Sequence, residues 1–153
     1  YWDNYRREPF DWYEMESGPY QTTWFHPPDR WNKPEDGISV EEQDPDAGSL
    51  LNIYRQAFRL RTEINALQDG GFEILDMEVS GQGPWGFVRE SRQETVYAVY
   101  NFGVESQTAI FDISKINGQI VDLLTGEEYP TPEDRSAFKI ELTPGAAVWL
   151  GTP

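Results

Sequence analysis

Acidic and aromatic side chains crowd the first third of the chain, where they could contact or cleave a sugar. Hydrolysis of a glycosidic bond needs two carboxyl groups, one acting as acid and the other as nucleophile or base. The carboxylates available in this zone are Asp3, Glu8, Asp11, Glu14 and Glu16. Their spacing singles out no pair, so we expect no catalytic residue within the chain.

Four of the six tryptophans also lie in this zone, at Trp2, Trp12, Trp24 and Trp31. Their rings could stack on the apolar face of a pyranose and form a sugar platform. The alternative, which we favour, is that they fill gaps between this segment and a body that the chain does not contain.

Two further candidates have simpler interpretations. His26 is the only histidine, and it could serve in Ser-His-Asp catalysis only with a nucleophile motif, which the sequence lacks. Because Pro27 follows it, we expect His26 to lie in a loop and to make one hydrogen bond. Residues 44–49 begin like a calcium loop but lack the glycine at its sixth position, and Arg55 stands where the bidentate glutamate belongs. We therefore expect Asp44 to cap a helix rather than to bind a metal.

Three zones must position these side chains. Six prolines in residues 1–48 predict an irregular loop. Residues 45–67 predict one helix, with Pro45 in its first turn, a stop at Gly70 and Gly71, and an apolar stripe. The stripe is formed by Leu50, Ile53, Tyr54, Ala57, Leu60, Ile64 and Leu67.

The remainder of the chain predicts strands. Phe138, Ile140 and Leu142 alternate with polar residues, and residues 96–100 are apolar on both faces, as in a central strand. We expect a small antiparallel β-sandwich with Trp85 and Trp149 in its core. The predicted strands are 72–77, 86–90, 95–102, 108–113, 119–124, 137–143 and 146–150.

Composition excludes several classes of protein. The net charge of −15 argues against nucleic-acid binding and against docking on an anionic membrane surface. The absence of cysteine excludes disulfides and thiolate metal sites. The chain opens with Tyr1 and has no signal sequence, so we expect it to be a piece of a longer polypeptide, here called the parent.

Short motifs occur along the chain in the order found in one enzyme family. Residues 7–12 (REPFDW) resemble R-x-P-[MF]-x-W, which follows the eighth barrel strand in the α-amylase family of glycoside hydrolases. The ordered set covers nearly the whole chain, which is identified as a member of that family. Its other motifs are Thr23-Trp24, Asn32, Val40–Gln43 and residues 44–46, 49–55, 60–61, 97–102 and 122–127.

The resemblance implies a mainly β fold: a Greek-key β-sandwich, called domain C, preceded by a long loop and one helix of a (β/α)8 barrel. Residues 1–69 would end the barrel and residues 70–153 would form domain C. The family's catalytic carboxylates would lie upstream of Tyr1. Calcium binding would belong to the missing barrel, so we expect no cofactor in this segment.

The same resemblance implies substrate contacts on the rim of the barrel. Arg7 matches an arginine placed to hydrogen-bond a glucose near the cleavage point, although Arg6 is one position away. Asp3 and Trp12 are further substrate-binding candidates on that rim. The expected partners are the missing barrel and an α-glucan or maltooligosaccharide.

The parent's activity has more than one interpretation. Glu8, Phe10 and Asp11 depart from the R-T-P-M-Q-W of strict α-glucosidases, which favours a retaining α-amylase acting on α-1,4 bonds. An α-glucosidase, an oligo-1,6-glucosidase or a trehalose synthase stays open. Two other roles for the chain itself are a non-catalytic starch-binding module and a purely structural or assembly role.

Overall fold

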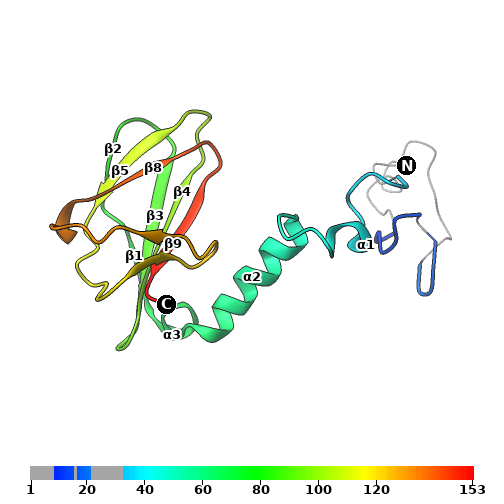
Figure 1. Ribbon diagram of the computed structural model, residues 1–153, viewed down its shortest axis with the longest axis horizontal. Coiled ribbons are helices and arrows are strands. Elements are labelled where there is room, and N and C mark those ends of the chain that lie inside the picture. Colours follow the sequence, from blue (N-terminus) through cyan, green and yellow to red (C-terminus); the bar gives the residue numbers. More distant parts are fainter. Residues whose placement is uncertain (1–8, 16, 22–32) are drawn as a thin grey trace, which may run out of the picture. The chain divides into compact units, whose positions relative to one another are not determined.

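A computed structural model describes residues 9–15, 17–21 and 33–153 (Figure 1). The chain divides into two compact parts, residues 1–56 and residues 57–153, which are treated separately below. Among the described residues, none of the helices has the length and apolar character needed to cross a membrane.

A short helix interrupts the zone expected to be an irregular loop. Helix α1 spans Val40–Gln43, and a reciprocal capping box stabilises its first turn. The backbone N–H of Glu42 donates to the Ser39 hydroxyl at 3.2 Å, and the Glu42 carboxylate accepts the Ser39 backbone N–H at 3.1 Å. Hydrogen bonds from the Ser39 hydroxyl, then from the Gly37 N–H, hold the pKa of Glu42 below its usual value.

The single helix predicted for residues 45–67 was wrong in its start and in its continuity. Helix α2 spans Leu50–Glu63 and helix α3 spans Asn65–Asp69, with extended backbone at Ile64 between them. Ser49 directly precedes α2 and caps its first turn, because the Ser49 hydroxyl accepts the Asn52 N–H at 3.3 Å. Asp44 is instead the C-cap of α1 and pairs with Arg55.

Residues 71–151 form two antiparallel sheets, which confirms the predicted β-sandwich. All seven predicted strands are present with shifted ends, and the prediction missed two strands of two residues each, β2 (Glu78–Val79) and β7 (Glu128–Tyr129). The larger sheet has the order β1-β3-β4-β9-β6-β7: Gly71–Ile74, Pro84–Glu90, Thr95–Asn101, Ala147–Gly151, Ile120–Asp122 and Glu128–Tyr129. The smaller sheet has the order β2-β5-β8: Glu78–Val79, Gln107–Phe111 and Phe138–Leu142, the last preceded by the 3-10 helix Arg135–Ala137.

The main core lies between the two sheets. Phe138, Ile140 and Leu142 point into it while Lys139 and Glu141 are exposed, as their alternation predicted. Strand β4 is central and buried on both faces, also as predicted.

The prediction for the two strand tryptophans was wrong. The registers Trp85↔Tyr100 and Ala98↔Trp149 place both indoles on the outer face of the larger sheet. There Trp149 is half-buried in a second apolar cluster, while 41% of Trp85 is exposed. Their residue type and their place in predicted strands indicated that both tryptophans pack in the core. The side of the sheet on which each lies depends on its position along the strand, because side chains alternate between the two faces.

Candidate functional site

The described part of the aromatic loop is held by hydrogen bonds to the segment around α1. The Val40 N–H donates to the Asp11 carbonyl and the Glu41 N–H to the Trp12 carbonyl, each at 3.1 Å. The Glu41 carboxylate accepts the Glu14 N–H at 3.0 Å. These contacts fix the backbone of residues 11–14, so the Trp12 side chain is presented from a braced loop.

Trp12 exposes an indole that is available for stacking. Its exposed fraction is 47%, and its ring centroid lies 4.6 Å from that of Phe10, which is 63% exposed. The Gln21 side chain is hydrogen-bonded to the backbone of both residues. It accepts the Trp12 backbone N–H at 3.4 Å and donates to the Phe10 carbonyl at 3.2 Å. An exposed aromatic pair on a held backbone can pack against the apolar face of a sugar ring with little loss of conformational entropy.

Gln43 and Asn52 explain two of the quoted motifs in structural terms. The Asn52 side-chain amide donates to the carbonyls of Gln43, Asp44 and Asp46 at 2.8–3.0 Å. The Gln43 side chain accepts the Leu51 N–H at 3.0 Å. Together they join the end of α1 to the start of α2, a role that the spacing of the motifs did not predict.

The acidic turn at residues 44–49 has structural partners. Asp44 pairs with Arg55, and an Asp46 carboxylate oxygen accepts the Gly48 N–H at 2.9 Å. Among the described residues, three or more potential metal ligands come together nowhere. Asp44 therefore caps the C-terminus of α1 and pairs with Arg55, and the prediction that it caps the N-terminus of the following helix was wrong.

Most of the predicted site residues lie outside the described part of the chain. This holds for the substrate-binding candidates Arg7 and Asp3, and their proposed contacts stay predictions. It holds also for Arg6, Glu8, Glu16, Trp2, Trp24, Trp31 and His26. Trp12 is the substrate-binding candidate whose surroundings the structure describes.

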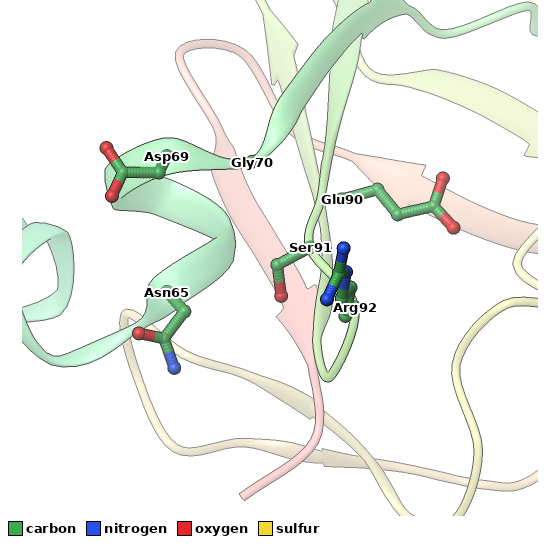
Figure 2. A pocket seen from close by; sticks show the side chains of 6 residues that line it. All are labelled: Asn65, Asp69, Gly70, Glu90, Ser91 and Arg92. Atoms are coloured by element: carbon green, nitrogen blue, oxygen red, sulfur yellow. The ribbon is translucent and has the colours of Figure 1, made fainter.

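A polar hollow lies beside α3 in the second part of the chain (Figure 2). None of its residues was among the predicted site residues. The carboxylates of Asp69 and Glu90 point away from one another there, and that of Glu90 pairs with Lys115 at 2.5 Å. The hollow thus lacks the facing carboxylates of a glycosidase. Its lining is Asn65, Asp69, Gly70, Glu90, Ser91 and Arg92.

Comparison with curated proteins finds relatives among alpha-amylases, oligo-1,6-glucosidases and alpha-glucosidases. The chain is 29% identical over 110 residues to alpha-amylase 3 of Dictyoglomus thermophilum, a match that covers 72% of this chain and 21% of that protein. It is 24% identical over 108 residues to the oligo-1,6-glucosidase IMA3 of Saccharomyces cerevisiae, covering 67% of this chain and 18% of that protein. The chain thus spans about a fifth of the length of these relatives. No protein-family model matches the chain.

Comparison with solved structures finds similar folds in enzymes with related names. An alpha-amylase from H. orenii aligns over 96% of this chain and 28% of its own, with a TM-score of 0.69 and 25% identity. AmyP, crystallised with maltotriose, aligns over 78% of this chain and 23% of its own, with a TM-score of 0.56 and 20% identity. The two antiparallel sheets resemble the C-terminal β-sandwich domain of such enzymes.

Proposed function

Because this chain is a relative of the α-amylase family of glycoside hydrolases, we propose that it is the C-terminal segment of an α-glucan-hydrolysing enzyme. The parent would be a retaining α-amylase that cleaves α-1,4-glucosidic bonds. Residues 1–69 would complete the catalytic barrel, and residues 70–153 would form domain C. The segment would thus serve the parent without cleaving glucan by itself.

The exposed Phe10–Trp12 pair is the observation that carries a substrate-rim role. In a barrel enzyme the active site lies at the carboxyl ends of the strands, in the loops that follow them. The resemblance assigns residues 7–12 to such a loop, and Trp12 is braced there with its indole exposed. Trp12 would stack on a sugar ring, and Arg7 and Asp3 would hydrogen-bond sugar hydroxyls.

The proposed mechanism separates catalysis from positioning. A retaining glycosidase attacks the anomeric carbon with one carboxylate while a second carboxyl group protonates the leaving oxygen, and water then resolves the glycosyl intermediate. Both groups would come from the upstream barrel. This chain's contribution would be to hold the sugar in place beside them.

The rim role is tested by Trp12→Ala in the parent. We expect the KM for maltooligosaccharides to rise about three- to tenfold with kcat changed less than about twofold, because stacking on a bound sugar is retained through the reaction. Met15→Ala is the matched control, since Met15 is 57% exposed in the same loop. The KM is measured by reducing-sugar release. An unchanged KM in Trp12→Ala would contradict the proposed contact between Trp12 and the substrate.

One alternative parent is favoured by a specific observation. The similar proteins include oligo-1,6-glucosidases and α-glucosidases of Saccharomyces cerevisiae as well as the amylase. A parent of that kind would release glucose from short isomaltooligosaccharides or maltooligosaccharides rather than shorten starch chains. Comparing soluble starch with maltose and isomaltose as substrates distinguishes the two.

A further inference from the structure

Three places in the sequence join an asparagine or an aspartate to a following glycine. Such a pair can react with itself, because the glycine backbone nitrogen lies near the side-chain carbonyl carbon and glycine has no side chain to hinder the approach. The reaction needs a glycine N–H that is not donated elsewhere, so the hydrogen bonds of each glycine distinguish the three pairs. The pairs are Asp36-Gly37, Asp69-Gly70 and Asn117-Gly118.

Two of the three pairs are protected by hydrogen bonds. The Gly37 N–H donates to the Glu42 carboxylate at 2.8 Å. The Gly70 N–H, at the end of α3, donates to the Ala66 carbonyl at 3.2 Å (Figure 2). A backbone nitrogen that is held in this way reacts only after the local structure opens. Reaction at both aspartates is therefore expected to be slow in the folded chain.

The third pair, Asn117-Gly118, is open. Both residues are exposed, in the segment between β5 and β6. In the part of the chain that the structure describes, neither the Asn117 side chain nor the Gly118 N–H has a hydrogen-bond partner. Gly118 has a φ of +98°, and no described atom lies within 4 Å of the position that a Cβ would take. The attacking nitrogen and the side-chain amide are thus both accessible to water.

We propose that Asn117 is a site of spontaneous deamidation. The Gly118 nitrogen loses its proton to water and bonds to the side-chain carbonyl carbon of Asn117. The C–N bond of the side-chain amide breaks, and the nitrogen leaves with a proton as ammonia. Water then opens the cyclic imide at either carbonyl and gives aspartate or isoaspartate. A water molecule is consumed for each ammonia released, so the reaction needs no oxidant and no further reactant.

The isoaspartate product would lengthen a segment that Arg135 holds. The Arg135 guanidinium donates to the Ile116 carbonyl and to the Gly118 carbonyl, each at 2.7 Å. Isoaspartate routes the main chain through its Cβ, which adds a methylene between these two carbonyls. The donors of a guanidinium form a rigid fork, so one Arg135 side chain would not keep both hydrogen bonds in their present geometry.

Buried residues lie on both sides of the modified position. Ile116 is 2% exposed and Ile120 is 0% exposed, and both belong to the main core. A longer main chain between them disturbs their packing as well as the Arg135 hydrogen bonds. Isoaspartate at this position is therefore expected to lower the stability of the sandwich. Aspartate, the other product, keeps the length of the main chain.

Incubation of the 153-residue chain at mildly alkaline pH, followed by peptide mass spectrometry, tests the site. Asp69→Asn is the matched control, because it places the same residue pair where the Gly70 N–H is donated to Ala66. Asp36→Asn is a second control, at the protected Gly37. Circular dichroism checks that each variant is folded, and a parallel incubation in urea removes the fold from every position.

We expect the folded chain to deamidate at Asn117 at least about tenfold faster than at either control position. In urea the positions should react at similar rates, because only the following glycine then matters. Equal rates in the folded chains would overturn the proposal. A rate at Asn117 that rises more than about tenfold in urea would also overturn it, because the fold would then protect this pair too.

The stability of the isoaspartate form tests the consequence. An isoaspartyl carboxyl methyltransferase with a labelled methyl donor identifies the isoaspartate fraction after ion exchange, and Asn117→Ala should abolish the signal. We expect a lower urea midpoint for this fraction and an unchanged midpoint for Asn117→Asp, which adds the charge alone. An unchanged midpoint in the isoaspartate fraction, or an equal loss in Asn117→Asp, would contradict the role given to main-chain length. Neither measurement involves catalysis, so both are independent of the proposed function.

Discussion

Replacing Asn101 with alanine is expected to lower the free energy of unfolding of the sandwich by roughly 3 kcal/mol. Asn101 is 1% exposed, and its side-chain amide donates to the carbonyls of Glu105, Leu142 and Thr143 at 2.8–3.1 Å. Its oxygen accepts the Gly103 N–H at 2.9 Å. Alanine would leave these backbone groups without their partner in a place that water reaches poorly.

Urea denaturation of the purified chain, followed by circular dichroism, measures the effect of Asn101→Ala. Asn117→Ala is the control, because Asn117 is exposed outside any helix or strand and its replacement should change stability by less than about 0.5 kcal/mol. A loss below about 1 kcal/mol for Asn101→Ala would mean that the amide does not hold the two strand ends together.

Replacing Arg7 with alanine in the parent is expected to lower kcat/KM on α-glucan more than tenfold. The proposed rim position lets a planar guanidinium donate two hydrogen bonds to sugar hydroxyls near the cleaved bond. Each tenfold decrease in kcat/KM corresponds to a loss of about 1.4 kcal/mol of transition-state stabilisation. Steady-state kinetics on maltooligosaccharides measures the ratio.

Arg6→Ala is the matched control for the Arg7 prediction, since the two arginines are adjacent. A large loss with Arg6→Ala and none with Arg7→Ala would move the assignment by one residue. Unchanged kcat/KM in both variants would contradict a substrate contact in this part of the loop.

The sandwich was predictable because its signals are local. Alternation in residues 138–142 and the apolar run 96–100 identify strand, burial and position in the sheet. The face on which Trp85 lies was not predictable, because it depends on the register with Tyr100 across two strands. The two-residue strands β2 and β7 are too short to leave a periodic pattern.

The helical region shows where local signals compete. Asp44-Pro45 is a good helix start by residue type, yet the capping box at Ser39 and Glu42 forms a separate helix that ends at Asp44. The Asn52 side chain then donates to the carbonyls of Gln43, Asp44 and Asp46, and α2 starts only at Leu50. Residue types alone do not rank a start at Asp44 against a start at Leu50, because the Asn52 contacts join residues that are six to nine positions apart.

The candidate site was predictable in part. Motif resemblance selected the loop around Trp12, and the structure adds that this indole is exposed on a backbone held by hydrogen bonds. The hydrogen-bonding role of Gln43 and Asn52 was hidden within motifs that could be quoted but not explained. The apolar outer side of the larger sheet, with Phe72, Trp85 and Tyr100, was missed because its residues come from three strands whose pairing brings them together.

The mass of the native polypeptide in its source cells tests most directly whether this chain belongs to a larger α-glucan-hydrolysing enzyme. An immunoblot with antibodies against the chain reports that mass, and starch zymography of the same gel reports activity. We expect one band several times heavier than 17.7 kDa that coincides with a zone of starch clearing. A band near 17.7 kDa without clearing would contradict the proposal and point to a free-standing binding or assembly protein.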